Sequence, residues 1–470
     1  MHPEWVEKFR SKGKEIKCVR GKYYLYERTT VWDKEKKMPK KISGAYLGRI
    51  TEDGLIGPQK KLSPIVAAED VANKEFGASD YLSKVGSDIA DNLRKHFPSL
   101  WQEIFTMAVL RTVDPQPFKR LEDAYQYSYL SVLYPKINLS KQRISTLLQS
   151  IGNNRQSIIR FMKDYISSAD HIIFDGTRIT TYSHEMNLAQ KGYNNNHQYD
   201  PQVNLLYAFS YSPTVAPVYY RVVPGNICDV TAFRGCIEES SLLKAVVIAD
   251  KGFGSAANFE LLEQAGLEYI VPLRRSCKEF DTEKIRSGYA DGFEDCFMFR
   301  NRPIWYFSSE NCTTYIDGEL RLKEETDYLR RIEEKKDGYT KEGFLEKRLK
   351  FGSIILRSNL NLDPKELYET YKKRAAIEQS FDILKNLLQQ DTSYMQSAVS
   401  FEAWSFINHI SLMLAYRLFE VLREKDLLKT FSISDALTLL SYVRKINLNN
   451  NWVTSEICKK SRVLIGKLNQ

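Results

Sequence analysis

The chain has 470 residues, of which 43% are hydrophobic and 27% are charged. These proportions are typical of a soluble globular protein, and the length predicts roughly two to four domains or subdomains. The most apolar window, residues 406–422, contains Asn408, Arg417 and Glu420, so we expect a buried helix and no membrane span. Seven cysteines without a Cys-x-x-Cys pair argue against a zinc site or a disulfide scaffold. The N-terminus has no secretory signal pattern, so we expect a cytoplasmic protein.

The net charge of +9 is concentrated near the N-terminus. Residues 1–50 hold fourteen Lys and Arg against six Asp and Glu. Aromatic residues are interleaved with this charge, namely Tyr23, Tyr24, Tyr26, Trp32 and Tyr46. Such a surface attracts a phosphate backbone, although a solvated basic surface explains the pattern equally well. Two alternating runs, Lys22–Thr30 and Ile42–Ile50, predict a β-hairpin around a basic turn.

Residues 64–166 have a helical pattern. Ser140 is expected to cap a helix that ends at Gly152, and another helix begins at Asn154. Two short helices joined by a Gly turn can form a DNA reader similar to a helix-turn-helix motif. Helical pairs are also common in proteins that never bind DNA, so the pattern alone leaves both interpretations open.

From residue 171 the pattern changes to strands and helices in alternation. The expected order is strand His171–Asp175, strand Val203–Tyr211, strand Val218–Val223, helix Asp229–Leu243, strand Ala245–Asp250, a helix from Ser255 to Gly266 and strand Tyr269–Leu273. Residues 275–355 separate this unit from the next helix, so we expect them to be an insertion. Within it, Phe297–Phe307 and Phe351–Arg357 have strand patterns, and Leu320–Lys350 is charged and helical.

Two of these apolar runs end in an acidic residue, Asp175 and Asp250. An Asp in this place is often only a turn or cap residue. A third carboxylate, Glu378, lies on a helix for which Asp363 is the expected N-cap and Glu366 completes a capping box. Because Mg²⁺ prefers oxygen ligands, commonly a few carboxylates plus substrate phosphate, three acids from distant points of the chain predict a metal site.

The expected helix also carries charge on one face. Tyr371, Arg374, Glu378 and Lys385 fall within an arc of about 60°. A salt-bridged surface helix is the simpler interpretation of such a face. Asp382 lies only about 20° from Tyr371 and is a rival to Glu378 as the third carboxylate.

These residues resemble a known constellation. Asp175, Asp250 and Glu378 are similar to the DDE triad of bacterial insertion-sequence transposases. The spacing Tyr371-x2-Arg374-x3-Glu378-x6-Lys385 matches, in all four letters and all three gaps, the Y-R-E-K signature of one large group of them, which includes cut-and-paste enzymes. The likeness extends from about residue 172 to residue 385. The run Gly225-Asn226-x2-Asp229-x2-Phe233 also resembles the segment that such enzymes carry before the second Asp.

The resemblance implies an RNase H-like core, with the first acid on the first strand, the second at the end of the fourth and the third on a later helix. It further implies that Asp175, Asp250 and Glu378 bind Mg²⁺, with Mn²⁺ as a substitute. These three residues would then be the catalytic residues for DNA cleavage and strand transfer.

Roles in DNA binding also follow from the resemblance. Arg374 and Lys385 would hold DNA phosphates, and Tyr371 would position the strand. Family members carry a β-rich insertion, some with an aromatic residue that stacks on a base flipped from the transposon end, and Trp305 is the best-placed Trp for this role. An aromatic residue on a strand is also commonly a core residue.

We therefore expect an α/β protein whose RNase H-like core is interrupted by a β-rich insertion, between a mainly helical N-terminal region and a helical C-terminal region. The expected regions are a basic β-hairpin region (1–62), a helical region that binds DNA (63–168), the first segment of the core (169–274), the insertion (275–358), the second segment of the core (359–392) and a helical C-terminal region (393–470). In the last region, helices are expected at Phe401–Glu424 and Ile433–Lys445.

The expected activity is cut-and-paste transposition by a bacterial, nucleoid-associated protein. Its partners would be the terminal inverted repeats of its own element, target DNA and a second copy of the chain in the paired-end complex. Two alternatives are an inactive or domesticated DNA-binding protein and an RNase H-like nuclease without strand transfer. The chain lacks a Walker pattern, so no nucleotide cofactor is expected.

Overall fold

The structure is a computed structural model of the chain, and it divides into two compact units. They are Met1–Ala72 with Asn447–Asn451, and Asn73–Ile446 with Trp452–Gln470. The structure describes residues 2–33, 36–57, 71–166, 171–183, 185–191, 201–211, 215–226, 229–240, 246–288, 291–375, 383–448 and 450–469. No helix in these ranges is long and apolar enough to cross a membrane.

The first unit contains a four-stranded antiparallel sheet. Its elements are α1 (Glu4–Glu7), β1 (Lys14–Val19), β2 (Lys22–Asp33), β3 (Met38–Thr51) and β4 (Gly54–Ile56). The predicted hairpin is confirmed as β2 and β3, and β1 and β4 extend the sheet on its two edges. Val6, Leu25 and Ile50 form a small buried core. The edge strands were not predicted because one is rich in lysine and the other has only three residues.

Helices dominate the start of the second unit, as expected from residues 64–166. They are α2 (Gly77–Val85), α3 (Ser87–His96), α4 (Trp101–Val113), α5 (Leu121–Tyr127), α6 (Leu130–Leu133), α7 (Lys141–Gly152) and α8 (Arg155–Ile166). Ser140 occupies the N-cap position of α7, but its side chain makes no capping hydrogen bond. The expectation missed one strand, β5 (Val71–Glu75).

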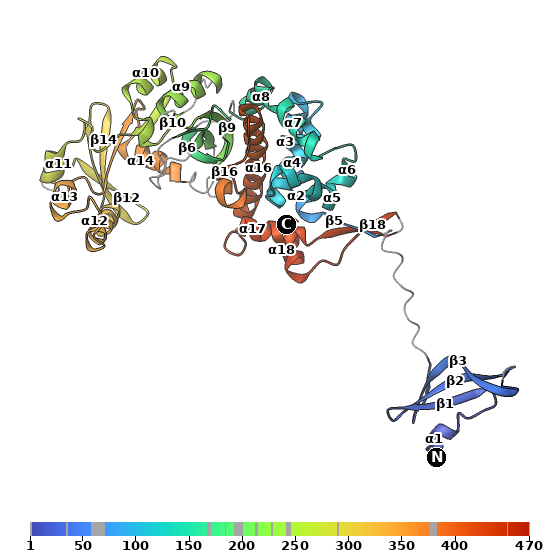
Figure 1. Cartoon of the computed structure of the whole chain (residues 1–470). Coiled ribbons are helices and arrows are strands. Elements are labelled where there is room, and N and C mark those ends of the chain that lie inside the picture. Colours follow the sequence, from blue (N-terminus) through green and yellow to red (C-terminus); the bar gives the residue numbers. More distant parts are fainter. Residues whose placement is uncertain are drawn as a thin grey trace. The chain divides into compact units, whose positions relative to one another are not determined.

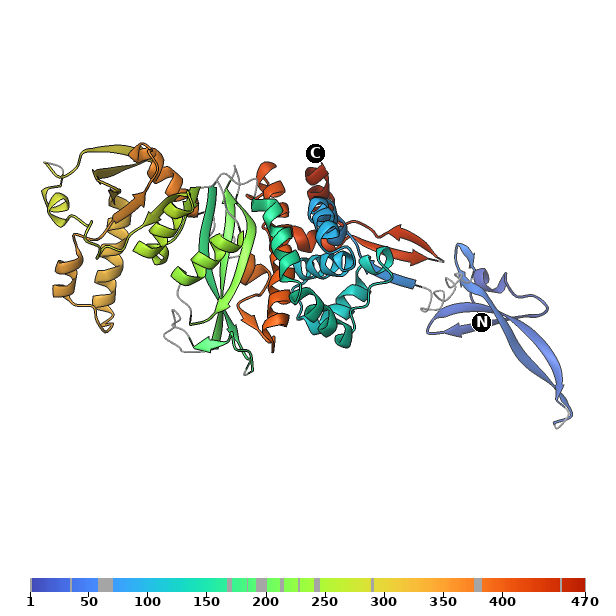
Figure 2. The ribbon, with the colours of Figure 1, turned by 90° about the horizontal axis from the view of Figure 1, so that it is seen from above.

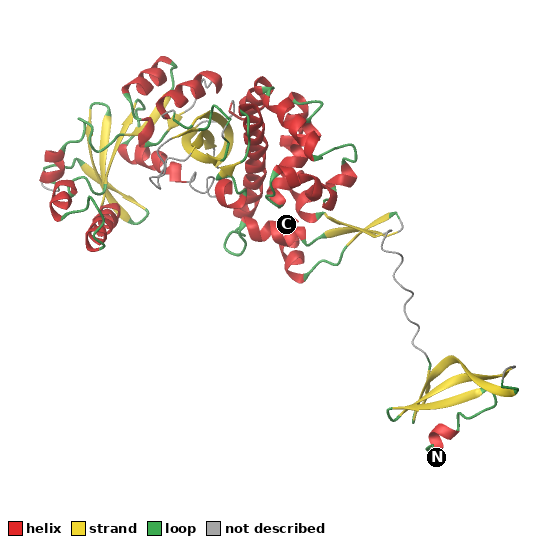
Figure 3. Ribbon diagram, in the orientation of Figure 1, coloured by secondary structure: helices red, strands yellow, loops and turns green. Residues whose placement is uncertain are grey.

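Among the described residues, a mixed sheet of eleven strands forms the centre of this unit (Figure 3). The strands are β6 (His171–Thr181), β7 (Gln190–Lys191), β8 (Pro201–Tyr211), β9 (Val215–Pro224), β10 (Val246–Ile248), β11 (Glu268–Pro272), β12 (Asp295–Phe299), β13 (Arg302–Ser309), β14 (Cys312–Asp317), β15 (Ser353–Ser358) and β16 (Thr392–Ser393). Their order is β12-β13-β14-β15-β11-β10-β6-β8-β7, with β9 paired to β8 and β16 paired to β6.

The predicted order of elements from residue 171 is present. β6, β8 and β9 pair antiparallel, and β10 and β11 run parallel to β6. Two helices lie between these strands in the sequence, α9 (Asp229–Ser240) and α10 (Ala256–Gln264). The cap of α10 is also confirmed, because Ser255 Oγ accepts a hydrogen bond from the Asn258 amide. The chain is therefore a mixed α/β protein.

Residues 275–358 continue the central sheet. β15 pairs antiparallel with β11, and β12, β13 and β14 extend the sheet outward from β15. Three helices accompany these strands: α11 (Thr282–Ser287), α12 (Gly318–Glu333) and α13 (Lys341–Lys347). β14 was not predicted, because all six of its residues are buried and its sequence lacks an alternating pattern.

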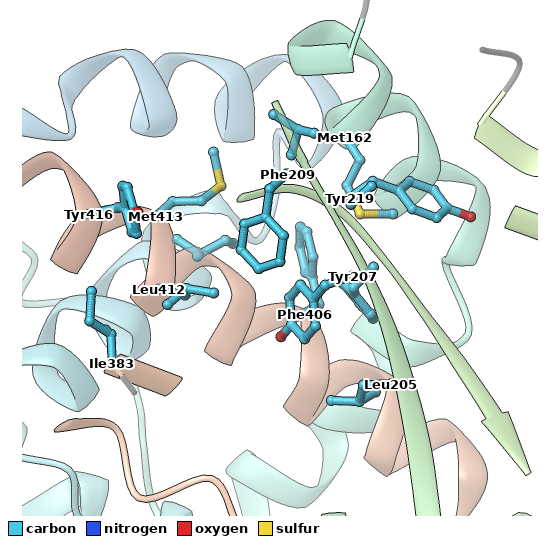
Figure 4. Close-up of a cluster of buried hydrophobic side chains, with 14 of the residues drawn as sticks. Met162, Leu205, Tyr207, Phe209, Tyr219, Ile383, Phe406, Leu412, Met413 and Tyr416 are labelled. Atoms are coloured by element: carbon cyan, nitrogen blue, oxygen red, sulfur yellow. The ribbon is translucent and has the colours of Figure 1, made fainter. Parts of the chain in front are cut away.

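The long helix α16 (Ala398–Glu424) lies between the sheet and the N-terminal helices (Figures 1 and 2). It contacts β9 on one side and α4 and α7 on the other. Tyr207 and Phe209 of β8 project toward Phe406 of α16 in the main hydrophobic core (Figure 4). The approach of α7 to α16 is so close that a side chain at Gly152 would overlap the carbonyl of Val399. The apolar window expected to be a buried helix is therefore a central helix of the core.

The C-terminal region is less helical than predicted. α17 (Ile433–Ser441) ends before Arg444, which begins the strand β17 (Arg444–Leu448). β17 pairs with β18 (Asn451–Thr454) and β5 in a small three-stranded sheet, and α18 (Lys459–Asn469) follows. Short strands with few apolar residues carry little sequence signal, so this sheet was missed.

Candidate active site

The register between β6 and β10 places Asp175 and Asp250 side by side. Ile173 of β6 is the partner of Ile248 of β10 in a parallel pair. Each Asp lies two residues beyond its Ile, so the two side chains leave the sheet on the same face at the same level. One prediction was wrong in detail: Asp175 does not end its strand, because β6 continues to Thr181 in pairing with β8. Asp250 does follow the end of its strand.

The carboxylate of Asp175 lies in a largely buried environment. Its side chain is 21% exposed, and Oδ1 accepts a hydrogen bond from the Gly176 amide at 2.8 Å. Burial raises the pKa of Asp175 above its ordinary value, and the neighbouring Arg374 opposes that increase. Asp250 adds to the increase in pKa because two like charges repel each other.

Arg374 brings a positive charge to both acids. Its Nη2 atom lies 2.9 Å from Asp175 Oδ2 and 3.6 Å from Asp250 Oδ1. Its Nε atom is buried and has no hydrogen-bond partner among the described residues. Tyr371 lies beside this group, and burial raises the pKa of its hydroxyl, whereas Arg374 lowers it. Four of the predicted site residues are thus brought together from three distant segments.

The segment that carries Arg374 is not one continuous α-helix, contrary to the prediction. α14 (Pro364–Lys372) begins as expected at the N-cap Asp363, but the cap accepts from the Lys365 amide at 2.8 Å and not in the reciprocal pattern of a capping box. The α-helix ends at Lys372, and a 3₁₀ turn, Lys373–Ala375, follows.

The remaining members of the signature cannot be placed in the same way. Glu378 and its rival Asp382 lie outside the described residues. The chain resumes in a π-helix, Ile383–Leu387, and the side chain of Lys385 within it is also outside the described set. The positions of these three side chains remain predictions.

The family described as "Transposase DDE domain" matches residues 166–414, which is more than half of the 470 residues. The chain belongs to this transposase family. No curated protein sequence matches it. Among solved structures, it is similar to a cryo-EM structure of a piggyBac transposase synaptic complex with hairpin DNA, with 10% identity and a TM-score of 0.38, over 73% of this chain and 70% of that one.

Phe233 supports both acid-bearing segments of this transposase DDE domain. Its ring packs edge-on against Phe174, the residue before Asp175, with centroids 5.0 Å apart. It also contacts Phe253, three residues after Asp250, at 5.3 Å. Phe233 is 1% exposed. The sequence singled out this position only through the Gly225–Phe233 resemblance, and its role as a packing residue beneath the acids was not predicted.

Gly225, from the same run, lies where β7, β8 and the end of β9 meet at one end of the central sheet. Its carbonyl accepts hydrogen bonds from Gln202 Nε2 and Asn204 Nδ2, both at 3.2 Å. A side chain at Gly225 would overlap the carbonyls of Gln202 and Gln190, so only glycine fits this approach of β7, β8 and the end of β9.

Trp305 lies on β13, within the residues predicted to be the insertion. It packs in a small hydrophobic cluster with Phe293, Phe307 and Ile316, and its ring centroid is 5.8 Å from that of Phe293. The side chain is partly exposed. The structure therefore gives Trp305 a packing role, and contact with a DNA base stays a prediction.

The described residues supply part of the ligand set that a hard divalent cation requires. Asp175 and Asp250 converge on one cationic atom, Arg374 Nη2, so their oxygens can reach a common centre. Within the described ranges, no group of three or more His, Cys, Asp or Glu side chains is arranged to hold a metal ion. The third carboxylate of the predicted set lies outside those ranges. Two carboxylates nevertheless agree with the preference of Mg²⁺ for a few carboxylates together with substrate phosphate.

Proposed function

We propose that this member of the transposase DDE-domain family is the transposase of a bacterial insertion sequence with the Y-R-E-K signature. It would bind the ends of its own element and catalyse metal-dependent DNA cleavage and strand transfer by a cut-and-paste route. The observation that carries the proposal is the convergence on Arg374 of Asp175, on β6, and Asp250, which follows the parallel strand β10.

In this proposal Asp175 and Asp250 hold Mg²⁺ within an RNase H-like core, with Glu378 as the third ligand and Mn²⁺ as a substitute. When bound, the metal supplies Lewis-acid activation of a water or a 3′-hydroxyl and stabilises the leaving oxygen of the phosphodiester. Asp175 must be ionised to act as a ligand, and the adjacent guanidinium of Arg374 favours that form.

The remaining signature residues would act on DNA directly. Arg374 would hold a DNA phosphate beside the acids, because its guanidinium lies within 3.6 Å of both Asp175 and Asp250. Tyr371, which lies beside Arg374, would position the strand. Lys385 would contribute a further phosphate contact. The basic N-terminal sheet would add contacts that do not depend on base sequence.

The test is a cleavage assay on a plasmid that carries this gene with its native flanks, in the presence of Mg²⁺. The proposal expects cuts at the element's borders that are lost in Asp175→Asn, Asp250→Asn and Glu378→Gln. Asp337→Asn, at an exposed position on the surface, is the matched control and should cut normally. Cuts that survive Glu378→Gln would transfer the third ligand role to Asp382.

Two other outcomes separate the alternatives. Border binding without cleavage by the wild-type protein would indicate an inactive or domesticated DNA-binding protein. Cleavage without joining of the released ends to a target plasmid would indicate a nuclease without strand transfer. The mass of the complex formed with border DNA tests the proposed homodimer.

A further inference from the structure

A pair of stacked tyrosines lies on the surface where β6 ends. Tyr182 follows β6 directly, and Tyr394 follows β16. Their ring centroids are 5.0 Å apart and their planes differ by 14°. Both side chains are well exposed, Tyr182 at 55% and Tyr394 at 66%. Large aromatic rings in this position present a flat apolar face to the solvent, which suits contact with another ring.

The backbone holds this pair in place. β16 pairs parallel with β6, with Thr392 opposite Thr180 and Ser393 opposite Thr181. The Tyr182 amide then donates a hydrogen bond to the Ser393 carbonyl at 3.2 Å. The two rings are therefore fixed by the central sheet, so little conformational entropy is lost when a ligand stacks on them.

A cavity of about 860 Å³ opens beside Tyr394. Phe118 and Trp404, both buried, contribute aromatic surface to it. Its rim carries two exposed basic residues, Lys119 and Arg120, on the 3₁₀ turn Phe118–Arg120. Aromatic surface next to exposed positive charge is the combination that binds a base and its flanking phosphates.

The cavity has a fixed relation to the candidate active site. Asp175 lies on β6, and Tyr182 directly follows that strand, seven residues later. Seven residues of extended strand correspond to about 23 Å. A strand with B-form spacing covers that distance in about seven nucleotides. The candidate active site and the tyrosine pair are thus separated along β6 by about the length of seven nucleotides.

We propose that Tyr394, Lys119 and Arg120 form a binding site for an unpaired base and its flanking phosphates in a DNA strand. The choice of DNA as the occupant rests on the proposed function, whereas the site itself rests on the stacked rings, the cavity and the basic rim. Tyr182 supports the ring of Tyr394 from behind.

The test measures binding of the full-length protein to a fluorescent thymidine 20-mer, to a duplex with a single-stranded extension and to a blunt duplex, all in EDTA. Tyr394→Ala should weaken binding to the first two ligands by about five- to a hundredfold. Tyr394→Phe should bind like the wild type, because the ring is retained. Binding to the blunt duplex should change less than twofold.

Tyr127→Ala is the matched control, because Tyr127 is 67% exposed and lies on α5. The double variant Lys119→Ala/Arg120→Ala should reduce the slope of log affinity against log salt by about 1.4 on single strands, as expected for two lost phosphate contacts. Equal losses in Tyr127→Ala and Tyr394→Ala, an unchanged affinity in Tyr394→Ala, or an equal loss on the blunt duplex would each overturn the proposal.

The binding experiment contains EDTA, so no free divalent metal ion takes part in it. Asp175→Asn tests only the proposed function, through loss of cleavage in Mg²⁺, whereas the binding assay in EDTA tests only the site at Tyr394. A failure of cleavage by the wild-type protein therefore leaves the binding result readable, and the two proposals can fail separately.

Discussion

The guanidinium of Arg374 lies 2.9 Å from the carboxylate of Asp175 and 3.6 Å from that of Asp250. A positive charge in that position reduces the repulsion between Asp175 and Asp250. It also competes for the same oxygens that a divalent cation requires. The signature arginine is therefore expected to have two effects of opposite sign, on metal binding and on DNA binding.

Arg374→Gln should bind Mn²⁺ more tightly than the wild type in the absence of DNA, because the competing cation is gone. An increase of about tenfold corresponds to about 1.4 kcal/mol. Electron paramagnetic resonance of free Mn²⁺ during a titration gives the affinity directly. Asp175→Asn should weaken Mn²⁺ binding in the same assay. Weaker Mn²⁺ binding by Arg374→Gln would show that the arginine assembles the metal site and does not compete with it.

Phe233→Ala should destabilise the protein by about 3–5 kcal/mol, because it leaves a cavity between Phe174 and Phe253. Urea unfolding followed by circular dichroism measures the change in free energy. Phe233→Leu keeps most of the volume and should cost less than half as much. If Phe233→Ala unfolds at the same urea concentration as the wild type, the ring does not support the acid-bearing segments.

His409 should make stability depend on pH. It is fully buried beside Tyr207 and Tyr220, and burial, with a contribution from Arg155, lowers its pKa from 6.5 to about 3. The unfolded chain takes up this proton below about pH 6.5 and the folded chain does not until about pH 3. Stability should therefore fall as pH falls through that window, by about 1.4 kcal/mol per pH unit from this residue.

His409→Phe removes that term and keeps a ring between the two tyrosines. Free energies of unfolding at several pH values between 4 and 7 should decline less steeply with acid in the variant than in the wild type. Parallel curves would mean that His409 takes up a proton in the folded protein.

Arg155 should be important for the attachment of helices to the sheet. Its guanidinium, on α8, contacts Glu402 of α16 at 2.7 Å and also contacts Glu239 of α9. Arg155→Met leaves both carboxylates partly buried without this cation and should cost about 3 kcal/mol in urea unfolding. Adding Glu402→Gln should restore some of the loss, because the isolated negative charge is removed. Additive losses in the double variant would contradict this account.

The sequence alone predicted the elements with strong local signals. The apolar runs before Asp175 and Asp250, the cap at Ser255 and the start of the helix at Pro364 are all present. These features depend on residues close together in the chain. The juxtaposition of Asp175 and Asp250 was expected from the set of carboxylates and from the resemblance to the DDE triad, because it depends on the pairing of β6 with β10.

The other features depend on pairings between distant segments. The stack of Tyr182 on Tyr394 requires β16 to pair with β6, across more than 200 residues. Arg374, which contacts Asp175, lies just after the end of the α-helix at Lys372, and no Pro or Gly marks that end. Tertiary contacts therefore decided both arrangements, and local patterns carried no signal for them.

The hydrogen bonds between β11 and β15 have a mechanical consequence. Because residues 275–358 share one sheet with β10, they cannot swing as a hinged lid, and a force applied there passes through β11 to the strand that precedes Asp250. Deleting residues 275–358 would remove β15, the strand that pairs with β11. The unpaired edge of β11 could then pair with another molecule. A shortened chain is thus expected to aggregate, and not to survive as a smaller active enzyme.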